Sequence, residues 1–227
     1  KLMAIGVSFI IPVLNEEDAV ADLLRDLRRC YPHSQLIVID GGSRDRTVAL
    51  ALPLCDQLLL SDSGRARQMN LGGQIAYMPY VFFLHADSCP SVSASALEAY
   101  LVARPAWGFC RVRLSSERLP FRIIEWFMNQ RSRITAVATG DQMVFVQKTV
   151  FDESGGFDDI PLMEDVAYCK RLRRLQAPLI IEAPVLTSSR RWEESGVVPT
   201  VLRMWVLRLA YFLGVAPATL WRYYYGR

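Results

Sequence analysis

The sequence predicts an α/β fold built around a mostly parallel β-sheet. Between residues 7 and 84, short apolar runs of strand length alternate with amphipathic stretches of helix length, in the order β-α-β-α-β-α-β. Strands that alternate with helices are typical of a parallel sheet joined by right-handed crossovers. The run Val7–Val13 (VSFIIPV) is apolar almost throughout, as expected for a strand that helices cover on both faces.

Each expected element of this half follows from its own pattern. The expected strands are Val7–Val13, Leu36–Ile39, Gln57–Leu60 and Tyr80–Leu84. The expected helices are a stretch from Val20 to about Pro32, then Thr47–Leu54 and Gly64–Met78. In the first helix the apolar spacing is helical at Val20, Leu23, Leu24 and Leu27. The polar run Asn15–Asp18 before it is typical of a helix cap with acids in the first turn.

The second half is less regular. We expect strands at Trp107–Leu114, Gln142–Gln147, Leu179–Glu182 and Val185–Thr187, and helices at Pro120–Ile134 and Glu164–Leu175. Two further helices, separated at Gly214–Pro217, follow near the C-terminus. The sequence therefore predicts one domain over residues 1–192 and a C-terminal helical appendage over residues 193–227.

Composition argues against several classes of protein. The net charge is only +3 and no basic block is present, so no nucleic-acid partner is expected. The five cysteines are scattered without a C-x-x-C pair, which argues against disulfides and zinc. No signal peptide is evident, and Met204–Leu213 is too short to span a bilayer. We expect a cytoplasmic protein, either soluble or peripheral on the inner face of the membrane.

Acidic residues follow three of the first four expected strands. Glu16 follows the first strand, Asp40 ends the second, and Asp87 follows the fourth. In sheets of this kind ligands bind outside the carboxyl ends of the strands. The functional site is therefore expected at this edge, where buried strands would mount the carboxylates rigidly.

The stretch Asp40–Thr47 (DGGSRDRT) has two interpretations. Its two glycines fit a tight turn between a strand and a helix. Alternatively, the Asp40 carboxylate holds the base or ribose of a nucleotide. The stretch contains neither the dinucleotide-binding G-x-G-x-x-G pattern nor a P-loop.

The H-A-D stretch, His85–Asp87, either simply ends a strand or holds a divalent cation. Mg²⁺ and Mn²⁺ prefer oxygen ligands and often take one or two carboxylates, because substrate phosphates fill other positions. Asp87 is then the expected ligand, and His85 is either a second ligand or a hydrogen-bonding neighbour.

Two further pairs each have a structural and a chemical interpretation. Glu164 and Asp165 at a helix start would offset the helix dipole, or one of them could be a general base for a hydroxyl. Arg190 and Arg191 are either solvated or grip a diphosphate.

The order of the motifs carries more information than any one of them. The chain reads P-x-x-N-E from Pro12, D-G-G-S-x-D-x-T from Asp40, G-R-A-x-Q-M-N over Gly64–Asn70, H-A-D, G-G-F over Gly155–Phe157, E-D, and R-R-W over Arg190–Trp192. Over about residues 5–192 it resembles a family-2 glycosyltransferase with the GT-A fold, in the small bacterial branch where H-A-D replaces D-x-D. The resemblance implies transfer of a sugar, with inversion, from a UDP- or GDP-sugar to an acceptor hydroxyl or lipid phosphate. It also implies Mg²⁺ or Mn²⁺ as cofactor.

The resemblance implies roles for single residues as well. The nucleotide would be bound by Pro12, Asn15, Glu16, Asp40 and one or both of Arg65 and Arg67. The metal would be bound by Asp87, with His85 beside it, and Asp165 would be the base that Glu164 helps to place. The acceptor and diphosphate side would be formed by Gly155, Gly156, Phe157, Arg190, Arg191 and Trp192.

The chain departs from the family pattern in two places. Ser188 and Ser189 stand where the family's Q-x-x-R-W element has Gln. The first acid of D-x-D is absent, which leaves fewer protein oxygens for a metal.

The C-terminal helices leave three alternatives open. Residues Val197–Tyr225 combine aromatic side chains with Arg203, Arg208 and Arg222, and contain no acid. Such helices can bind a membrane interface, pair with a second subunit, or pack on the domain itself. A lipid-linked acceptor would suit the first of these.

Two rival functions are distinguishable. A nucleotidyltransferase would normally have a glycine-rich basic loop after the first strand, where this chain has the acidic Leu14–Glu17. A catalytically decayed nucleotide-sugar-binding or membrane-docking module would bind the donor without turnover.

Overall fold

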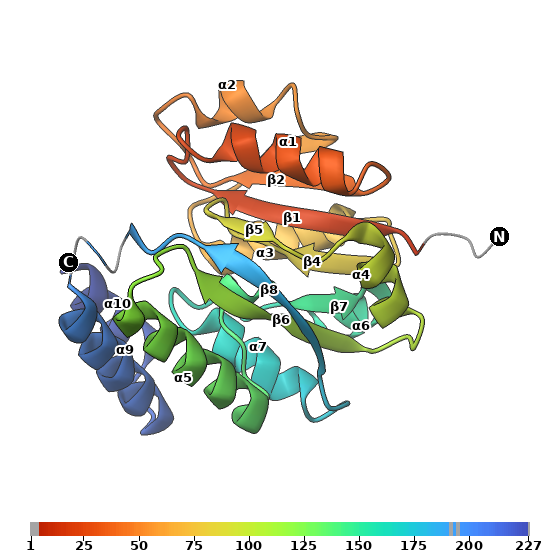
Figure 1. Ribbon diagram of the computed structural model, residues 1–227. Coiled ribbons are helices and arrows are strands. Elements are labelled where there is room, and N and C mark those ends of the chain that lie inside the picture. The colour runs from red at the N-terminus through yellow and green to blue at the C-terminus, as the bar shows by residue number, and fades with distance from the viewer. Residues whose placement is uncertain (1–4, 191–192, 194–195, 227) are drawn as a thin grey trace.

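The computed structural model describes residues 5–190, 193 and 196–226. Within that part of the chain, one eight-stranded sheet has the order β3-β2-β1-β4-β7-β6-β8-β5 (Figure 1). Its parallel half consists of β1 (Val7–Val13), β2 (Gln35–Asp40), β3 (Gln57–Leu60) and β4 (Tyr80–Phe83). Its mixed half consists of β5 (Ser88–Pro90), β6 (Trp107–Leu114), β7 (Phe145–Gln147) and β8 (Leu179–Thr187). Strand β7 is antiparallel to both β4 and β6, β5 is antiparallel to β8, and β6 and β8 are parallel.

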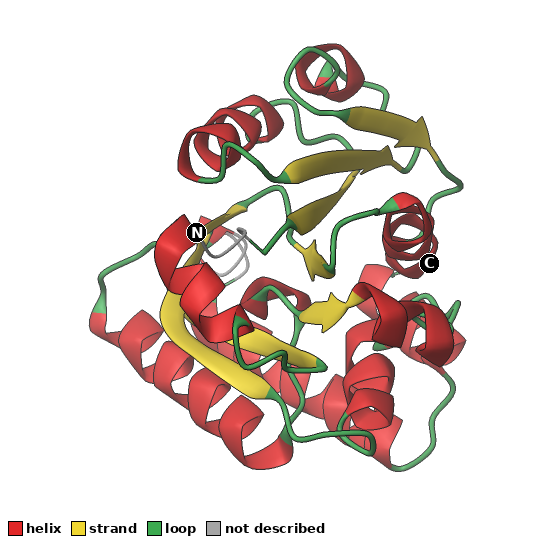
Figure 2. Cartoon of the chain, turned by 90° about the vertical axis from the view of Figure 1, so that its right-hand side faces the viewer, coloured by secondary structure: helices red, strands yellow, loops and turns green. Residues whose placement is uncertain are grey.

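Helices lie on both faces of the sheet, as Figure 2 shows. Those of the first half are α1 (Val20–Cys30), α2 (Thr47–Ala51), α3 (Arg65–Ile75) and α4 (Ala94–Leu101). Those of the second half are α5 (Leu119–Thr135), the 3-10 turn η1 (Gly140–Gln142), α6 (Lys148–Ser154) and α7 (Glu164–Leu172). Two C-terminal helices follow, α9 (Val197–Phe212) and α10 (Pro217–Tyr225).

Alternation along the strands divides the core in two. In β1, Phe9 and Ile11 pack with the apolar faces of α1 and α4. Ile10 between them packs on the opposite side, with residues of α3, α6 and α7. Successive strand side chains point to opposite faces, so a strand that is apolar at every position serves both layers. The expected α/β class is confirmed.

Several expected boundaries differ in the structure, three of them for β7, β8 and α2. Strand β7 begins only at Phe145, because Gln142 lies in η1 and its buried side chain accepts a 2.6 Å hydrogen bond from Ser132 Oγ. The two short strands expected after residue 178 are one strand, β8, since a register shift against β6 between Cys110 and Arg111 absorbs two extra residues. Helix α2 ends at Ala51.

The polar run before α1 does not cap that helix with a side chain. The first residue of α1 is Val20, and the preceding Ala19 makes no side-chain capping bond. Asn15 instead has a positive φ of 55° and accepts a 2.9 Å bond from Arg44 N through its side-chain oxygen. The polar side chain thus joins two loops rather than starting the helix.

One buried side chain of α3 ties the parallel strands together where they end. Gln68, which is 5% exposed, donates through Nε2 to Val13 O at 2.9 Å and to Ile39 O at 2.8 Å. Helix α3 can come this close because Gly72 faces β1, where a Cβ would lie 2.3 Å from Ile10. The carboxyl ends of β1 and β2 are therefore fixed relative to each other.

Helices α9 and α10 pack on the domain. Val197 and Val201 contact the cluster of Leu114, Phe121 and Ile124. Leu207 and Leu220 form a second cluster with Met163, immediately before α7. Among the described residues, every helix is too short or too polar to cross a bilayer.

Replacing Gln68 with Met should destabilise the protein while keeping the side-chain volume. The carbonyl groups of Val13 and Ile39 would each lose one hydrogen bond inside the core, although Val13 O keeps the bond from Gly41 N. The loss costs about 1 to 3 kcal/mol in free energy of unfolding. Urea unfolding of the variant measures this cost. The matched control is Gln74→Met on the exposed side of the same helix, where a change below about 0.5 kcal/mol is expected. Equal stabilities for the two variants would refute the structural role of Gln68.

Candidate active site

Two loops at the carboxyl ends of β1 and β2 are bonded to each other through polar side chains. Asn15 N donates to Ser43 Oγ at 2.8 Å, Glu16 N donates to Thr47 Oγ1 at 2.7 Å, and Glu17 N donates to Asp45 Oδ2 at 3.2 Å. These bonds place the expected nucleotide-pocket residues Pro12, Asn15, Glu16 and Asp40 around one edge of the sheet. The two motifs P-x-x-N-E and D-G-G-S-x-D-x-T thus form one structural unit.

Asp40 carries a buried oxygen that the protein leaves without a partner. The residue is 1% exposed, and its Oδ2 accepts 2.9 Å bonds from the backbone N–H groups of Gly42 and Ser43. Its Oδ1 is buried and has no hydrogen-bond partner among the described residues. A buried acceptor without a donor is unfavourable, so this oxygen is suited to a ligand N–H.

The motif G-R-A-x-Q-M-N on α3 directs its polar side chains to different parts of the site. Arg65 Nη1 lies 3.7 Å from Glu164 Oε1. Arg67 turns elsewhere and donates from Nε to both carboxylate oxygens of Asp159, at 2.9 and 3.0 Å. Sequence gave no way to choose between the two arginines, whereas the structure brings only Arg65 beside the expected base.

Asn70, the last residue of that motif, holds the G-G-F turn. Its side chain donates to Phe157 O at 2.8 Å and accepts from Phe157 N at 2.7 Å. Gly155 and Gly156 have φ values of 75° and 70°, which L side chains rarely adopt. The Phe157 ring is buried and packs on Phe83, so these residues shape the path of the chain toward α7 from within the core.

Glu164 and Asp165 begin α7 directly after a strained residue. Met163 has a φ of 70°, a left-handed conformation that costs about 1 kcal/mol or more outside glycine. Glu164 is 4% exposed beside Arg65. Asp165 accepts from Gly140 N at 3.0 Å through Oδ2 and from Val166 N at 2.7 Å through Oδ1.

Burial and the neighbouring Glu164 carboxylate raise the pKa of Asp165 to about 6, against the opposing effects of Arg65 and the two backbone N–H groups. The guanidinium of Arg65 is desolvated, but Glu164, Asp165 and Asp141 outweigh this and raise its pKa. A carboxylate with a pKa near neutrality is well suited to accept a proton. This supports the second acid of E-D, rather than the first, as the basic group.

His85 and Asp87 lie between β4 and β5, and His85 is close to η1. His85 Nδ1 is 3.6 Å from Asp141 Oδ1, and a Cβ on Gly140 would lie 2.2 Å from the imidazole ring. Asp87 is exposed and accepts a 3.2 Å bond from Ser88 Oγ through Oδ1. Its backbone oxygen accepts from Ser188 N at 3.2 Å, so the segment that leads to Arg190 runs beside it. Arg190 is exposed, and Arg191 and Trp192 lie outside the described residues.

Sequence reasoning missed Asp141 and Arg131. Asp141, in η1, is next to His85, and both Asp141 and Asp165 act electrostatically on Arg131 of α5. Burial lowers the pKa of Arg131, and the two acids act against that effect. The short polar stretch T-G-D-Q after α5 could have drawn attention to Asp141. It was overlooked because a strand was expected to begin at Gln142.

A metal ion would need substrate oxygens at this site. Among the described residues, no group of three or more His, Cys, Asp or Glu side chains is arranged to hold one. The carboxylate of Asp87, exposed at the end of β4, nevertheless has the oxygen chemistry that Mg²⁺ and Mn²⁺ prefer, and those ions commonly take few protein ligands. The residues present fit a cation held jointly by Asp87 and a diphosphate.

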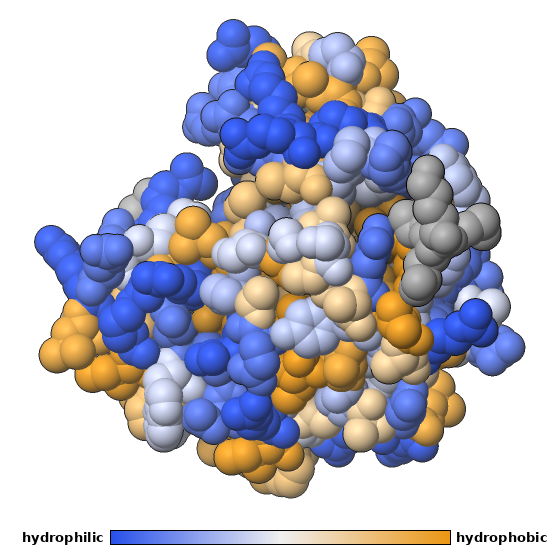
Figure 3. Space-filling model, turned by 45° about the vertical axis from the view of Figure 1, so that its right-hand side comes forward, coloured by the Kyte–Doolittle hydropathy of each residue, from blue (hydrophilic) through white to orange (hydrophobic). Residues whose placement is uncertain are grey.

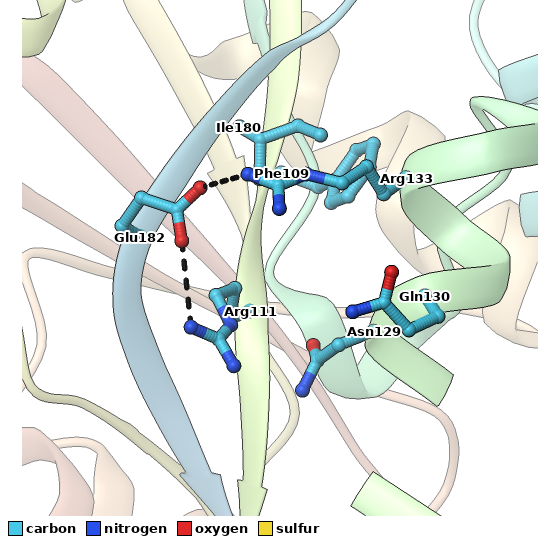
Figure 4. Close-up of a pocket in the computed structure, with 7 residues that line it drawn as sticks. All are labelled: Phe109, Arg111, Asn129, Gln130, Arg133, Ile180 and Glu182. Carbon is cyan, nitrogen blue, oxygen red and sulfur yellow. Dashed lines mark hydrogen bonds and ion pairs between the residues drawn. The ribbon is translucent and has the colours of Figure 1, made fainter. Parts of the chain in front are cut away.

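A separate cavity of about 100 Å³ lies between α5 and strands β6 and β8 (Figure 4). Its Glu182 accepts bonds from Arg111 at 3.4 Å and Arg133 at 2.7 Å. The cavity is smaller than the roughly 300 Å³ that small-molecule sites begin at. Its residues come from the beginnings and middles of the strands, away from the loops described above.

Residues 8–147 match the family model described as glycosyl transferase family 2, which is more than half of the 227-residue chain. The chain therefore belongs to glycosyl transferase family 2. A search among curated proteins finds no match.

Solved structures confirm the GT-A fold. TarS residues 1–349 from S. aureus is 15% identical, with a TM-score of 0.64 over 81% of this chain and 60% of that one. A mannosyltransferase from Pyrobaculum calidifontis, PcManGT, solved with GDP-Man and Mn²⁺, is 18% identical, with a TM-score of 0.60 over 80% of this chain and 56% of that one. The chain thus spans less than two thirds of either neighbour, and at these identities the likeness concerns the fold.

Removing the Asp165 carboxylate should change how stability depends on pH. The folded-state pKa of about 6 lies above the ordinary value of about 3.9, so the folded protein binds this proton more tightly than the unfolded chain does. Wild type should therefore lose up to about 2 to 3 kcal/mol, relative to Asp165→Asn, as pH rises from 4 to 7. Urea unfolding at a series of pH values measures the difference. Wild type and Asp165→Asn free energies of unfolding that change equally with pH would contradict the prediction. Asp18→Asn, at an exposed position, is the control.

Proposed function

We propose that this glycosyltransferase moves a sugar, with inversion, from a nucleotide-diphosphate sugar to an acceptor hydroxyl. The observation that carries the proposal is that α3 contacts the regions of two special carboxylates, through Gln68 at the strand ends next to Asp40 and through Arg65 beside Glu164 and Asp165. Asp165 is a desolvated carboxylate, and Asp40 Oδ1 is a buried acceptor without a hydrogen-bond partner among the described residues. The first suits proton abstraction and the second suits a nucleobase N–H. The structural neighbours TarS, solved with UDP-GlcNAc, and PcManGT, solved with GDP-Man, support a UDP- or GDP-sugar as donor.

On the donor side, Asp40 Oδ1 would accept the ring N–H that uracil and guanine both present. Pro12, Asn15 and Glu16 would line the nucleoside pocket. The loop that contains Asn15 and Glu16 is hydrogen-bonded to the loop that follows Asp40. Arg65 would reach the diphosphate or sugar because its guanidinium is partly exposed and lies beside Glu164. Arg67, bonded to Asp159, would stabilise the loop before α7.

On the reaction side, Asp165 would take the proton from the acceptor hydroxyl as its oxygen attacks the anomeric carbon. Glu164 would keep the pKa of Asp165 raised by its charge, while Gly140 N and Val166 N hold the carboxylate in place. Attack opposite the leaving diphosphate inverts the anomeric centre and needs no covalent intermediate.

The cofactor in this proposal is Mg²⁺ or Mn²⁺, held by Asp87 with His85 and Asp141 close by. When bound, such an ion neutralises charge on the leaving diphosphate. Arg190 follows the segment bonded to Asp87 and would add positive charge on that side. Gly155, Gly156 and Phe157 would act indirectly, by placing α7.

The proposal is tested by mixing the protein with Mg²⁺ or Mn²⁺ and a panel of UDP-, GDP- and dTDP-sugars. Release of the nucleoside diphosphate from one donor, lost in Asp87→Ala, supports it. Pyrophosphate formation from a nucleoside triphosphate and a sugar phosphate would point to a nucleotidyltransferase. Tight donor binding without turnover, with any acceptor or membrane extract, would point to a decayed binding module.

Turnover should follow the ionisation of Asp165. We expect kcat/KM to rise with pH through about 6 and then level, because only the unprotonated carboxylate accepts the acceptor proton. Asp165→Asn should lower kcat about 10²- to 10⁴-fold and remove that step from the profile. Steady-state kinetics between pH 5 and 8 measure both effects. A variant that keeps the step near pH 6 would assign the base elsewhere.

Replacing Asp40 with Asn should weaken donor binding far more than it slows chemistry. An amide N–H placed opposite the base N–H would leave two donors facing each other, which costs about 1 to 3 kcal/mol, or roughly 10- to 100-fold in the donor KM. Steady-state kinetics with the active donor, with Asp62→Asn as an exposed control, separate KM from kcat. An unchanged KM would place the base outside this pocket.

A further inference from the structure

The outward face of α5 is mostly apolar and is interrupted by Gln130. Five large side chains on it are between 49% and 81% exposed: Leu119, Ile123, Trp126, Phe127 and Ile134. Their spacing of three, four or seven residues puts them on one side of the helix. The opposite side of α5 carries the buried Phe121 and Ile124. Helix α5 therefore has two apolar faces, only one of which the domain covers.

Helix α9 has the same organisation. Six large apolar side chains on or directly after it are between 53% and 77% exposed: Leu202, Trp205, Val206, Leu209, Phe212 and Leu213. Helical spacing places them together, opposite the buried Leu207. The domain thus covers only one side of α9, as it covers only one side of α5.

The two helices share one buried cluster. Val197 and Val201 of α9 pack against the cluster that Phe121 and Ile124 of α5 form with Leu114, and α5 and α9 are drawn next to each other at the lower left of Figure 1. Figure 3 shows hydrophobic residues along the lower left margin of the surface that it draws. We call the eleven exposed side chains of the two helices the α5–α9 face. Exposed apolar side chains in such numbers mark a site of membrane or protein interaction.

We propose that the α5–α9 face docks the enzyme on an anionic lipid bilayer. Trp126 and Trp205 are the amphipathic side chains typical of membrane interfaces. Exposed arginines flank the apolar residues at Arg118, directly before α5, and Arg203, on α9. Arg222 is exposed on the following helix, α10, and the one exposed acid next to these arginines in sequence is Glu117. Residues 197–227 contain no acid. This combination of apolar, aromatic and cationic side chains complements lipid headgroups of negative charge.

A second copy of the chain fits the face less well. A symmetric pairing would oppose the arginines of one copy to those of the other, and neither α9 nor α10 has an acid to pair with them. On α5, Glu125 is already bonded to Arg122 at 3.0 Å and to Leu114 N at 3.2 Å. Charge therefore favours the bilayer as the occupant.

Docking in this way would bring the proposed acceptor side close to the membrane. Leu207 and Leu220 of the C-terminal helices pack on Met163, next to Glu164 and Asp165. Arg131, on the inner side of α5, lies within the electrostatic influence of Asp165. This extension rests on the proposed function, and it makes a membrane-borne molecule the acceptor class.

Vesicle co-sedimentation of the full chain tests docking without any turnover. We expect binding to vesicles of phosphatidylcholine and phosphatidylglycerol, weaker binding to phosphatidylcholine alone, and weakening with added salt. The double variant Trp126→Glu/Trp205→Glu should bind at least tenfold more weakly, with an unchanged circular dichroism spectrum. The control is Leu52→Glu/Tyr77→Glu, which changes two equally exposed apolar residues outside the face and should bind like wild type.

Three results would overturn the docking proposal. They are the absence of vesicle binding by wild type, equal binding by the two double variants, and a stable dimer in light scattering that only Trp126→Glu/Trp205→Glu dissociates. For the acceptor, sugar transfer to vesicles made from membrane lipid extract should fall at least tenfold in that variant while donor hydrolysis in solution is unchanged. Equal transfer would exclude a membrane-borne acceptor, and loss of donor hydrolysis from every protein would instead refute the proposed function.

Discussion

The arrangement of the site depends on one buried amide at the ends of two strands. The carbonyl groups of Val13 and Ile39 lie at the end of β1 and next to the end of β2, and Gln68 of α3 donates to both, while Val13 O also accepts from Gly41 N. Buried carbonyls need such donors, and meeting that need with one side chain fixes α3 to both strands. The loop containing Asp40 and the loop containing Asn15 then start from fixed points. On the same helix, Arg65 lies beside Glu164 and Asn70 donates to Phe157 O, so α3 also positions these residues.

Charge in the site is balanced across elements that are far apart in the sequence. Asp141, Glu164 and Asp165 come from η1 and α7, and the cations that act on them, Arg65 and Arg131, come from α3 and α5. Asp165 is desolvated and lies next to Glu164, and Arg65 offsets these effects only in part, so the pKa of Asp165 stays raised. Helix α5, which supplies Arg131 on its inner side, also presents exposed apolar side chains on its outer side. One helix thus contributes both to the charge of the site and to the face that we assign to lipid.

The sequence predicted the parallel half of the sheet well because its strands are short, mostly apolar runs and its first helix has a clear period. It predicted less of the mixed half. Strand β5, with only Ser88–Pro90, and helix α6 have patterns too short to detect. Asp141 escaped notice because its importance comes from its closeness to His85 and its effect on Arg131, one of which is distant in sequence. Whether Arg65 or Arg67 faced the site depended on a helix turn that only tertiary structure fixes.

A crystal structure with bound UDP or GDP would test the central claim most directly. The claim is that Asp40 and Asp165 face one pocket from two sides, with a nucleotide diphosphate between them. We predict the base N–H within hydrogen-bond distance of Asp40 Oδ1, the diphosphate beside Asp87, and the Asp165 carboxylate open toward the position of the sugar. A nucleotide bound elsewhere, for example in the cavity beside Arg111 and Arg133, with Asp40 Oδ1 still unpartnered, would contradict the account.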